Sequence, residues 1–281
     1  MSFFRKKENK IIIRFFGGLG NQLFIFAFSK SLALSSNSLL FIDNYSGFIF
    51  DRYRRKYLLN NFLIEIPKVN IFYLLYLKFL NKYNIISKKV VFIREKNSRC
   101  IESALLNFSP LSSVTFLEGY WQSYKYFNKY SEQIKASLNI DNINVNKEVR
   151  LHAIKIKNTE SVAIHVRRVD YQDKLHINYY LNAIDFFKNI NGVKFYIFSD
   201  DIEWCKLNFA TNEFIYFSNN SEIEDFYLMT KCNNFIIANS SFSWWAAWLS
   251  DSISKKVIAP KNTSIGCKNE FYPDDWILIE N

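Results

Sequence analysis

The chain has 281 residues, of which 49% are hydrophobic and 18% aromatic, so its length suits one large domain or two modest ones. This composition can bury a substantial core and excludes an intrinsically disordered chain. The formal charge of +10 at pH 7 indicates an acidic partner, and nucleic acid, an anionic membrane face and a nucleotide-sugar all qualify.

The cysteines and the apolar stretches indicate in which cellular compartment the protein lies. Four cysteines lie far apart and form no CxxC pair, which argues against a zinc site or a disulfide framework and fits a reducing compartment. The N-terminus, MSFFRKKENK, lacks the apolar core of a signal peptide, and the most apolar stretch, residues 71–80, is too short to span a bilayer. We therefore expect a cytoplasmic protein. Residues 71–80 predict a core helix, with an interfacial helix as the minority interpretation.

The N-terminal part begins with a β-turn-α-β pattern. Residues 11–16 and 39–43 read as buried strands, and GGLGNQ at residues 17–22 opens an apolar helical stretch between them. Gly18 and Gly20 fit a dinucleotide-binding fingerprint, but a leucine occupies the position of its third glycine. An NAD-dependent oxidoreductase therefore stays as an alternative.

The same glycines predict a close approach of backbone and ligand. Gly18 and Gly20 would let the chain come near a ligand and open a helix N-terminus toward it, from which Asn21 and Gln22 project. A plain tight turn explains the glycines but not the polar pair.

An aromatic patch follows at residues 116–127, FLEGYWQSYKYF, which reads as a strand end and a loop. Tyr120, Trp121 and Tyr124 offer flat apolar faces beside Gln122, the mixture that holds sugar rings or bases. Such a group can equally be core, and the sequence leaves both interpretations open.

The polar segment at residues 140–158 carries the strongest shift in composition and predicts a helix that crosses between domains. After it, short apolar strands alternate with helical segments, which predicts a parallel sheet flanked by helices: VAIHV, KFYIFSD, EFIYFS, NFIIANS and KKVIAP. Ser221 and Glu224 form a capping box, which predicts a helix start there.

Charged and polar residues stand where these strands end, the edge at which open α/β sheets bind ligands. The first strand delivers a cluster of His165, Arg167, Arg168 and Asp170. Two adjacent guanidiniums suit a diphosphate, whereas the alternative is a structural ion pair of either arginine with Asp170.

Two further strand ends complete this predicted nucleotide site. Asp200 and Asp201 end one strand, and Asn239, Ser240, Ser241 and Ser243 precede a tryptophan-rich helix. Hydroxyls and amides at a helix start form a seat for an anion, although any single serine can be an ordinary N-cap.

Together these motifs resemble a known family. GGLGNQLF, GYWQSYKYF, HVRRVDY, FSDDIEWCK and LMTKCNNFIIANSSFSWWAAWLS are similar, in that order, to the bacterial α-1,2-fucosyltransferases of glycosyltransferase family 11, and the resemblance extends from residue 11 to about 276. It implies a GT-B-like fold of two facing Rossmann-like α/β domains with parallel sheets flanked by helices. Residues 1–157 would form the acceptor-side domain and residues 158–281 the domain that binds GDP-fucose.

The resemblance also implies the reaction. L-Fucose would pass with inversion from GDP-β-L-fucose to the 2-hydroxyl of an acceptor sugar, with galactose expected, without a metal or another cofactor. The acceptor would be an oligosaccharide of a surface glycan such as O-antigen, free or lipid-linked, and contact with the inner membrane face would be peripheral. A fucosyltransferase of other linkage or with a protein acceptor is one alternative. A basic nucleic-acid-binding protein is another, but it leaves the strand-end residues unexplained.

The roles follow from this resemblance. Arg167 would hold the β-phosphate, and Asn21 would reach in from the other domain, with Asp170 as a third catalytic candidate. The general base is open among Asp170, Asp173 and His176, and a dissociative reaction needs no strong base. Donor-binding residues would be His165, Arg168, Asp200, Asp201, Asn239, Ser240, Ser241, Ser243, Gly18 and Gly20, and acceptor-binding residues Tyr120, Trp121, Gln122 and His176.

Overall fold

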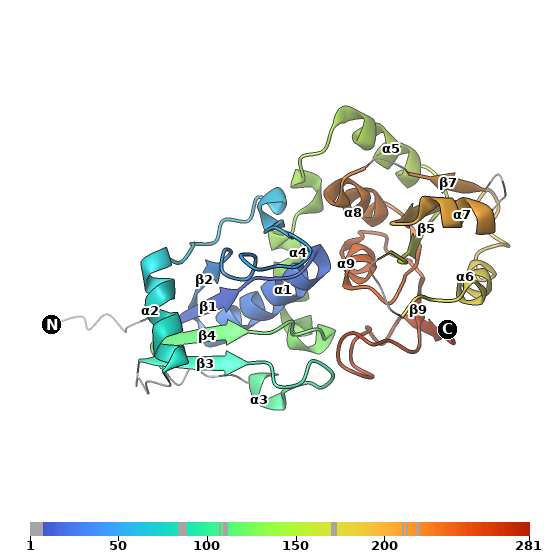
Figure 1. Ribbon diagram of the computed structural model, residues 1–281. Coiled ribbons are helices and arrows are strands. Elements are labelled where there is room, and N and C mark those ends of the chain that lie inside the picture. The colour runs from blue at the N-terminus through green and yellow to red at the C-terminus, as the bar shows by residue number, and fades with distance from the viewer. Residues whose placement is uncertain are drawn as a thin grey trace. The chain divides into compact units, whose positions relative to one another are not determined.

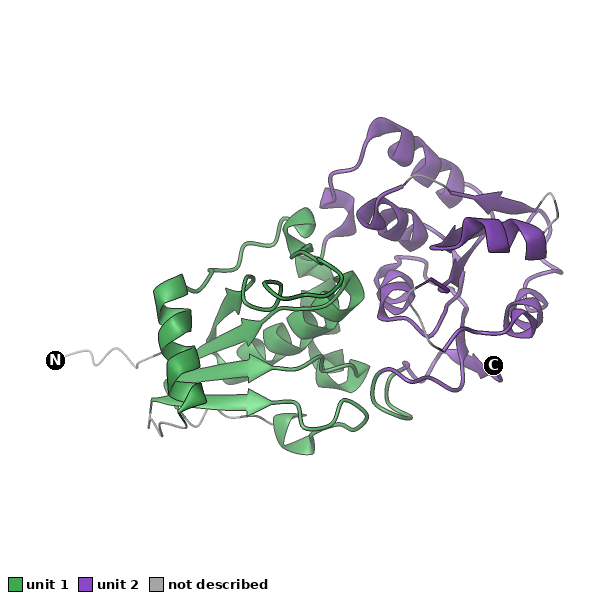
Figure 2. Cartoon of the chain, viewed as in Figure 1, with its two compact units in different colours: residues 1–138, 266–271 green, residues 139–265, 272–281 purple. Residues whose placement is uncertain are grey.

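The computed structural model describes residues 8–83, 89–106, 108, 112–169, 173–209, 211, 213–217 and 220–281. The chain forms two compact units, which Figure 2 shows in different colours: residues 1–138 with 266–271, and residues 139–265 with 272–281. A short segment near the C-terminus, residues 266–271, thus belongs to the first unit. The division differs from the predicted one at 157/158. The cause is helix α5 (Lys147–Lys157), which packs on α8 (Glu222–Thr230) instead of crossing between units.

The first unit is built on a parallel sheet with the strand order β2-β1-β4-β3. Its strands are β1 (Lys10–Arg14), β2 (Leu39–Asp43), β3 (Val90–Arg94) and β4 (Val114–Glu118). Its helices are α1 (Leu19–Ser36), α2 (Ile71–Lys82), α3 (Ser103–Leu106) and α4 (Ser131–Ser137), with 3-10 turns η1 (Leu59–Phe62), η2 (Tyr124–Tyr126) and η3 (Asn128–Tyr130). The predicted strands at residues 11–16 and 39–43 are present, whereas β3 lies in a segment whose pattern predicts no strand.

Two helices cover the two faces of this sheet (Figure 1). Successive side chains of a strand point to opposite faces, so Ile12 packs with Leu74 and Leu77 of α2, and Ile11 and Ile13 point the other way. Helix α1 is apolar around most of its circumference, which is typical of a helix surrounded by protein, and most of its residues are buried.

The second unit contains a larger parallel sheet with the strand order β10-β9-β8-β5-β6-β7. Its strands are β5 (Ser161–Val166), β6 (Lys194–Ser199), β7 (Phe214–Tyr216), β8 (Asn234–Ile236), β9 (Val257–Pro260) and β10 (Ile277–Ile279). Besides α5 and α8, it has α6 (Ile177–Ile184), α7 (Ile202–Asn208), α9 (Ser241–Leu249) and the turn η4 (Ile140–Asn142). Every strand predicted after residue 158 is present, and the capping box of Ser221 and Glu224 begins α8 as predicted.

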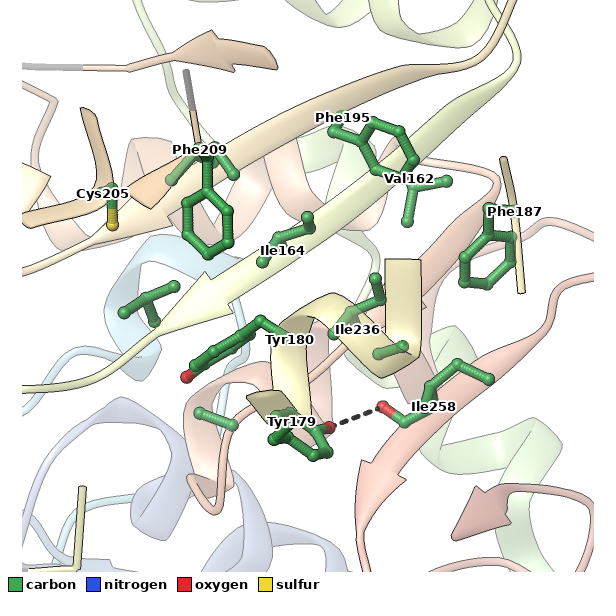
Figure 3. Packing of buried hydrophobic residues seen from close by; sticks show 14 of the residues in the cluster. Val162, Ile164, Tyr179, Tyr180, Phe187, Phe195, Cys205, Phe209, Ile236 and Ile258 are labelled. Carbon is green, nitrogen blue, oxygen red and sulfur yellow. Dashed lines mark hydrogen bonds between the residues drawn. The ribbon is translucent and has the colours of Figure 1, made fainter. Parts of the chain in front are cut away.

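The core of the second unit forms around β5 (Figure 3). Val162 and Ile164 pack against Tyr179 and Tyr180 of α6, and the Tyr179 hydroxyl donates to the backbone oxygen of Ile237 at 2.6 Å. Burial of this kind contributes roughly 1.5–3 kcal/mol per large apolar side chain, so β5 is held rigidly. The backbone position of the residues that directly follow β5 is therefore well defined.

The second sheet has one place where the order of strands reverses, and it lies between β5 and β8. In open α/β sheets the carboxyl ends of two such strands border a crevice that binds ligands. In the first sheet β1 lies beside β4, but the order falls on both sides of this pair and does not reverse. The residues that follow β5 and β8 are therefore the main candidates for a ligand site.

Candidate active site

The arginine loop after β5 is held by a carboxylate from the next strand. Asp200, at the end of β6, accepts the backbone N–H groups of Arg168 at 2.8 Å and Val169 at 3.1 Å. Its Oδ2 also lies 3.2 Å from Nε of Arg167. Asp200 therefore fixes both the backbone of the loop and the direction of Arg167. The sequence predicts these carboxylates and arginines at one edge but not this pairing.

Arg168 is fixed separately. Its Nε lies 3.4 Å from Oδ2 of Asp201, and its guanidinium stacks 4.0 Å above the ring of Trp204. Asp201 also caps α7 by accepting the N–H of Trp204 at 3.1 Å. Both arginines are partly exposed, with 34% and 21% of their side-chain surfaces accessible for Arg167 and Arg168. Two oriented cations thus stand at the crevice edge. Both arginines form ion pairs, with Asp200 and Asp201 as partners, whereas Asp170, the partner in the predicted ion-pair alternative, lies outside the described residues.

His165 is the last-but-one residue of β5, and its ring is buried. Burial, assisted by the charge of Arg167, lowers the pKa of His165 from 6.5 to about 3, so the imidazole is neutral at physiological pH. Its Nδ1 is buried and has no hydrogen-bond partner among the described residues. Buried polar atoms are normally paired, so an orphan of this kind calls for a ligand or a water molecule.

Asn239 presents a second orphan atom across the same crevice, three residues after β8. Its amide nitrogen donates to the backbone oxygen of Asp173 at 2.8 Å, which ties down the loop that enters α6. Its buried Oδ1 has no hydrogen-bond partner among the described residues. Asn239 and His165 therefore offer unused polar atoms on the two strands between which the order reverses.

The serines before α9 divide into different roles. Ser240 is an ordinary N-cap, because its hydroxyl accepts the N–H of Phe242 at 3.3 Å. Ser243 is fully buried, and its hydroxyl donates to the backbone oxygen of Ser240 at 3.3 Å. Ser241 begins the helix and is partly exposed. Of the predicted serine seat, Ser241 and the backbone of the first turn remain the groups suited to an anion.

The three base candidates have different surroundings. Asp170 lies outside the described residues. Asp173 is exposed, and its backbone accepts from Asn239. His176 is also exposed and caps α6, with Nδ1 accepting the N–H of Asn178 at 3.3 Å.

In the first unit, two predicted motifs meet. Asn21, in the first turn of α1, accepts from Nε2 of Gln122 at 2.8 Å, although the two residues are far apart in sequence. Gln122 in turn accepts the N–H of Gly266 through its Oε1 at 3.1 Å. The amide of Gln122 thus links α1 to the segment that returns at residues 266–271. Neighbouring Gln22 is structural, since it bonds the backbones of Gly17, Lys56 and Leu58.

The glycine that this turn requires is Gly17, which the sequence analysis did not single out. Its φ of 78° favours glycine, and a Cβ there would lie 2.7 Å from Nδ2 of Asn21. Gly18 has an extended conformation as the N-cap of α1, and Gly20 is buried in the first helical turn. Gly17 therefore makes the room in which the Asn21 side chain lies.

The aromatic patch is partly core. Trp121 is fully buried and stacks on Phe28 with ring centroids 4.4 Å apart. The prediction that Trp121 offers a ring face to a sugar does not fit this packing. Tyr120 is partly exposed beside Phe16, with ring centroids 4.6 Å apart. Tyr120 is therefore the residue of the pair that can meet an acceptor.

A further ionic cluster at the strand ends of the first unit is absent from the predictions. Arg14, at the end of β1, donates to Glu118, at the end of β4, over 3.0 Å, and also to Ser46 over 3.1 Å. Arg94, at the end of β3, lies 3.7 Å from the same glutamate. The strand-end rule that finds Arg167 would have found these residues too.

Among the residues that the structure describes, no group of three His, Cys, Asp or Glu side chains could hold a metal ion.

A family model described as glycosyl transferase family 11 matches residues 10–280. The chain belongs to glycosyltransferase family 11. An α-1,2-colitosyltransferase of Escherichia coli is 32% identical over 96% of this chain and 99% of its own length. The O-antigen biosynthesis glycosyltransferase WbnK of the same organism is 29% identical over 94% of this chain and 98% of its own length. The predicted resemblance is thus confirmed at the level of the family.

A solved structure of lower sequence identity than these relatives has a similar fold. The crystal structure of the α-1,6-fucosyltransferase NodZ soaked with GDP-fucose matches with a TM-score of 0.53 and 17% identity, over 86% of this chain and 93% of that one. At this identity the similarity concerns the fold alone. It confirms the predicted GT-B-like α/β class for this family 11 protein.

Proposed function

We propose that this protein transfers L-fucose, or its 3-deoxy analogue colitose, from a GDP-linked donor to the 2-hydroxyl of an acceptor sugar, with galactose expected. The observation that carries the proposal is the set of groups at the carboxyl ends of β5, β6 and β8. Two oriented arginines stand there together with two buried polar atoms that lack partners among the described residues.

The diphosphate is assigned to Arg167 and Arg168. Breaking the bond between sugar and phosphate leaves negative charge on the departing GDP, and fixed cations stabilise that charge where it develops. Asp200 and Trp204 hold the two guanidiniums before the donor arrives, so less conformational entropy is lost on binding. We assign Arg167 to the β-phosphate and Arg168 to a second phosphate contact, with Ser241 and the start of α9 beside them.

The nucleoside is assigned to His165 and Asn239. The neutral imidazole can accept or donate through Nδ1, and the amide Oδ1 accepts only, so the pair can bind ribose hydroxyls or donors on the guanine ring. Asp200 and Asp201, which the sequence assigns to guanine or ribose, already hold the arginine loop and α7. We therefore propose Asp200 as a positioning residue for Arg167.

The acceptor is assigned to the first unit, around Tyr120 and the pair of Asn21 and Gln122. The relatives named above support an oligosaccharide of a surface glycan as acceptor, since one is named for O-antigen biosynthesis. A lipid-linked form of such a glycan, used at the inner membrane face by a cytoplasmic enzyme, is part of the proposal. Asp170, Asp173 and His176 remain the candidates for the base.

Colitose enters as a second donor because one relative, similar over nearly the whole chain, is named a colitosyltransferase. The two sugars differ by one hydroxyl. A site that hydrogen-bonds this hydroxyl rejects the analogue that lacks it by about 10⁴–10⁵, whereas an apolar pocket discriminates by only about 10². Turnover of GDP-fucose and GDP-colitose with one acceptor therefore decides between the donors.

Calorimetry with GDP, GDP-fucose, GDP-mannose and NADH tests the donor site. We expect GDP and GDP-fucose to bind, and Arg167→Ala to weaken both by about tenfold or more, as expected for a charge-assisted hydrogen bond. The matched control is Arg94→Ala, which removes a strand-end arginine of the first unit that is also paired to a carboxylate.

Three outcomes contradict the proposal. Binding of NADH alone would favour the oxidoreductase. Equal losses for Arg167→Ala and Arg94→Ala would show a general effect of charge. Binding of random oligonucleotides with a steep dependence on salt would favour the nucleic-acid-binding alternative.

A further inference from the structure

Helix α2 of the first unit (Ile71–Lys82) has two very different faces. Leu74, Leu77 and Leu80 are buried, and the first two pack on Ile12 and Phe116 of the sheet. This face accounts for the stability of the helix. It uses only three of the 12 residues of the helix.

The outer face is apolar as well. Its large side chains recur every three or four residues, with Leu75 and Tyr76 side by side, which places them along one stripe of a helix: Phe72, Leu75, Tyr76, Phe79 and, just after the helix, Tyr83. Phe72 is 77% exposed and Phe79 is 53% exposed. Single exposed apolar residues are ordinary, but a contiguous stripe of five marks a surface that binds something.

The charges that α2 itself carries have one sign. Lys78 and Lys82 lie on α2 and are exposed, and the helix contains no aspartate or glutamate. The partner of this surface must therefore be apolar beneath and anionic at its boundary.

A second copy of the chain fits this description poorly. Two-fold self-association would bring two copies of this surface together, and α2 offers no aspartate or glutamate with which the lysines of the other copy could pair. A bilayer with anionic headgroups satisfies both requirements. Aromatic side chains lie at the level of the headgroups, and lysine reaches from an apolar boundary toward phosphate.

The helix can lie on a membrane but cannot cross it. With 12 residues it is about 18 Å long, and a span needs about 20 residues. No helix among the described residues is long and apolar enough to cross a membrane. We propose that the outer face of α2 docks this protein on an anionic lipid bilayer. The docking goes beyond the proposed function, because it requires neither donor nor acceptor.

Flotation with vesicles tests the docking. The wild-type protein is mixed with vesicles of phosphatidylcholine alone or of phosphatidylcholine and phosphatidylglycerol in equal parts. We expect binding to the anionic vesicles that weakens as salt is added, since exposed charges are screened. The double variant Phe72→Ser/Phe79→Ser should lower the partition coefficient roughly tenfold or more. Each of Lys78→Glu and Lys82→Glu should lower it roughly fivefold or more.

The matched control is Leu207→Ser, which removes an apolar side chain that is 83% exposed on helix α7 of the second unit. It should bind vesicles like the wild type. GDP binding by calorimetry should be unchanged in every variant, so failure of docking and failure of the proposed function remain distinguishable.

Three results would overturn the docking. The first is a wild type that does not bind anionic vesicles, and the second is equal binding by the Phe72→Ser/Phe79→Ser variant and the control. The third is a wild-type dimer that this variant abolishes in sedimentation experiments, which would assign the surface to a second copy.

Discussion

The two sheets of the molecule differ in how the polar side chains after their strands are paired. At the edge of the first sheet, Gln122 bonds Asn21 on one side and Gly266 on the other, and Arg14 bonds Glu118 and Ser46. The buried Nε1 of Trp121 also has no partner among the described residues, but its ring is packed in the core on Phe28. At the edge of the second sheet, His165 and Asn239 each keep one buried polar atom without a partner in the described chain.

This difference indicates which groups support the structure and which groups bind a ligand. A polar network whose members bond each other stabilises and orients its surroundings, whereas a buried atom without a partner costs about 1–3 kcal/mol until a ligand or water satisfies it. We infer that the edge between β5 and β8 carries the tightest ligand contacts. We propose that the bonded groups after β1 and β4 form a preformed surface for the acceptor.

The largest effect is expected from Arg167. Replacing it with alanine should cost about 3–4 kcal/mol of transition-state stabilisation, or about 10²–10³ in kcat, because the charge of the departing diphosphate would lose a fixed cation. The measurement is turnover in a preparation whose unfolding midpoint matches the wild type. Arg94→Ala, in the first unit, should stay within about threefold, as befits an exposed ion pair. Near wild-type turnover of Arg167→Ala would contradict the assignment of Arg167 to the β-phosphate.

Gln122 should show the opposite profile. Gln122→Leu leaves the N–H of the buried Gly266 without its partner and removes one hydrogen bond to Asn21. The free energy of unfolding should fall by about 2–3 kcal/mol, since an orphaned buried group costs about 1–3 kcal/mol and a lost hydrogen bond about 0.5–1.5 kcal/mol, and GDP binding should persist. Urea denaturation and calorimetry provide the two readings. A large loss of GDP affinity with full stability would reverse the roles of the two edges.

The pH dependence of stability should report on His165. Burial and the charge of Arg167 lower its pKa from 6.5 to about 3. Below pH 6.5 the imidazole of His165 therefore binds a proton in the unfolded chain but stays neutral in the folded chain. The stability is complete above pH 6.5 and falls as pH drops toward 3, by about 2 kcal/mol between pH 7.5 and pH 5.

Urea midpoints at these two pH values, compared between the wild type and His165→Phe, isolate this contribution. Burial raises the pKa of Asp225 from 3.8 to about 6, which acts in the opposite sense because stability is lost as pH rises through that value. Asp225 is present in both proteins, so its effect cancels in the difference. An equal change of the urea midpoint between the two pH values in both proteins would contradict a buried, neutral His165.

The sequence predicts the second unit better than the first. Its short apolar strands are separated by clear turn and cap signals, as at Ser221, and parallel strands bring their carboxyl ends to one edge. The neighbourhood of Arg167, Asp200 and Asn239 therefore follows from topology alone. Which carboxylate holds which arginine does not follow, because this depends on the register between β5 and β6.

In the first unit, tertiary contacts determine the structure more than local sequence patterns do. Trp121 could be core or sugar-binding by its type, and only its packing on Phe28 decides. The return of residues 266–271 to this unit has no signal in composition, since it depends on backbone contacts such as that between Cys267 and Gln122. Long-range partners of this kind cannot be found from periodicity in a single sequence.

The smallest effect is expected from chelation. We assign the diphosphate to Arg167 and Arg168, and the carboxylates beside them, Asp200 and Asp201, are engaged with those arginines and with backbone N–H groups. A cation would have to displace these bonds to gain its oxygen ligands. We expect EDTA to change turnover by less than about twofold, because the guanidiniums supply the charge themselves. Strict dependence on added manganese would mean that the arginine pair is not sufficient, and Asp200→Asn would then abolish the metal response.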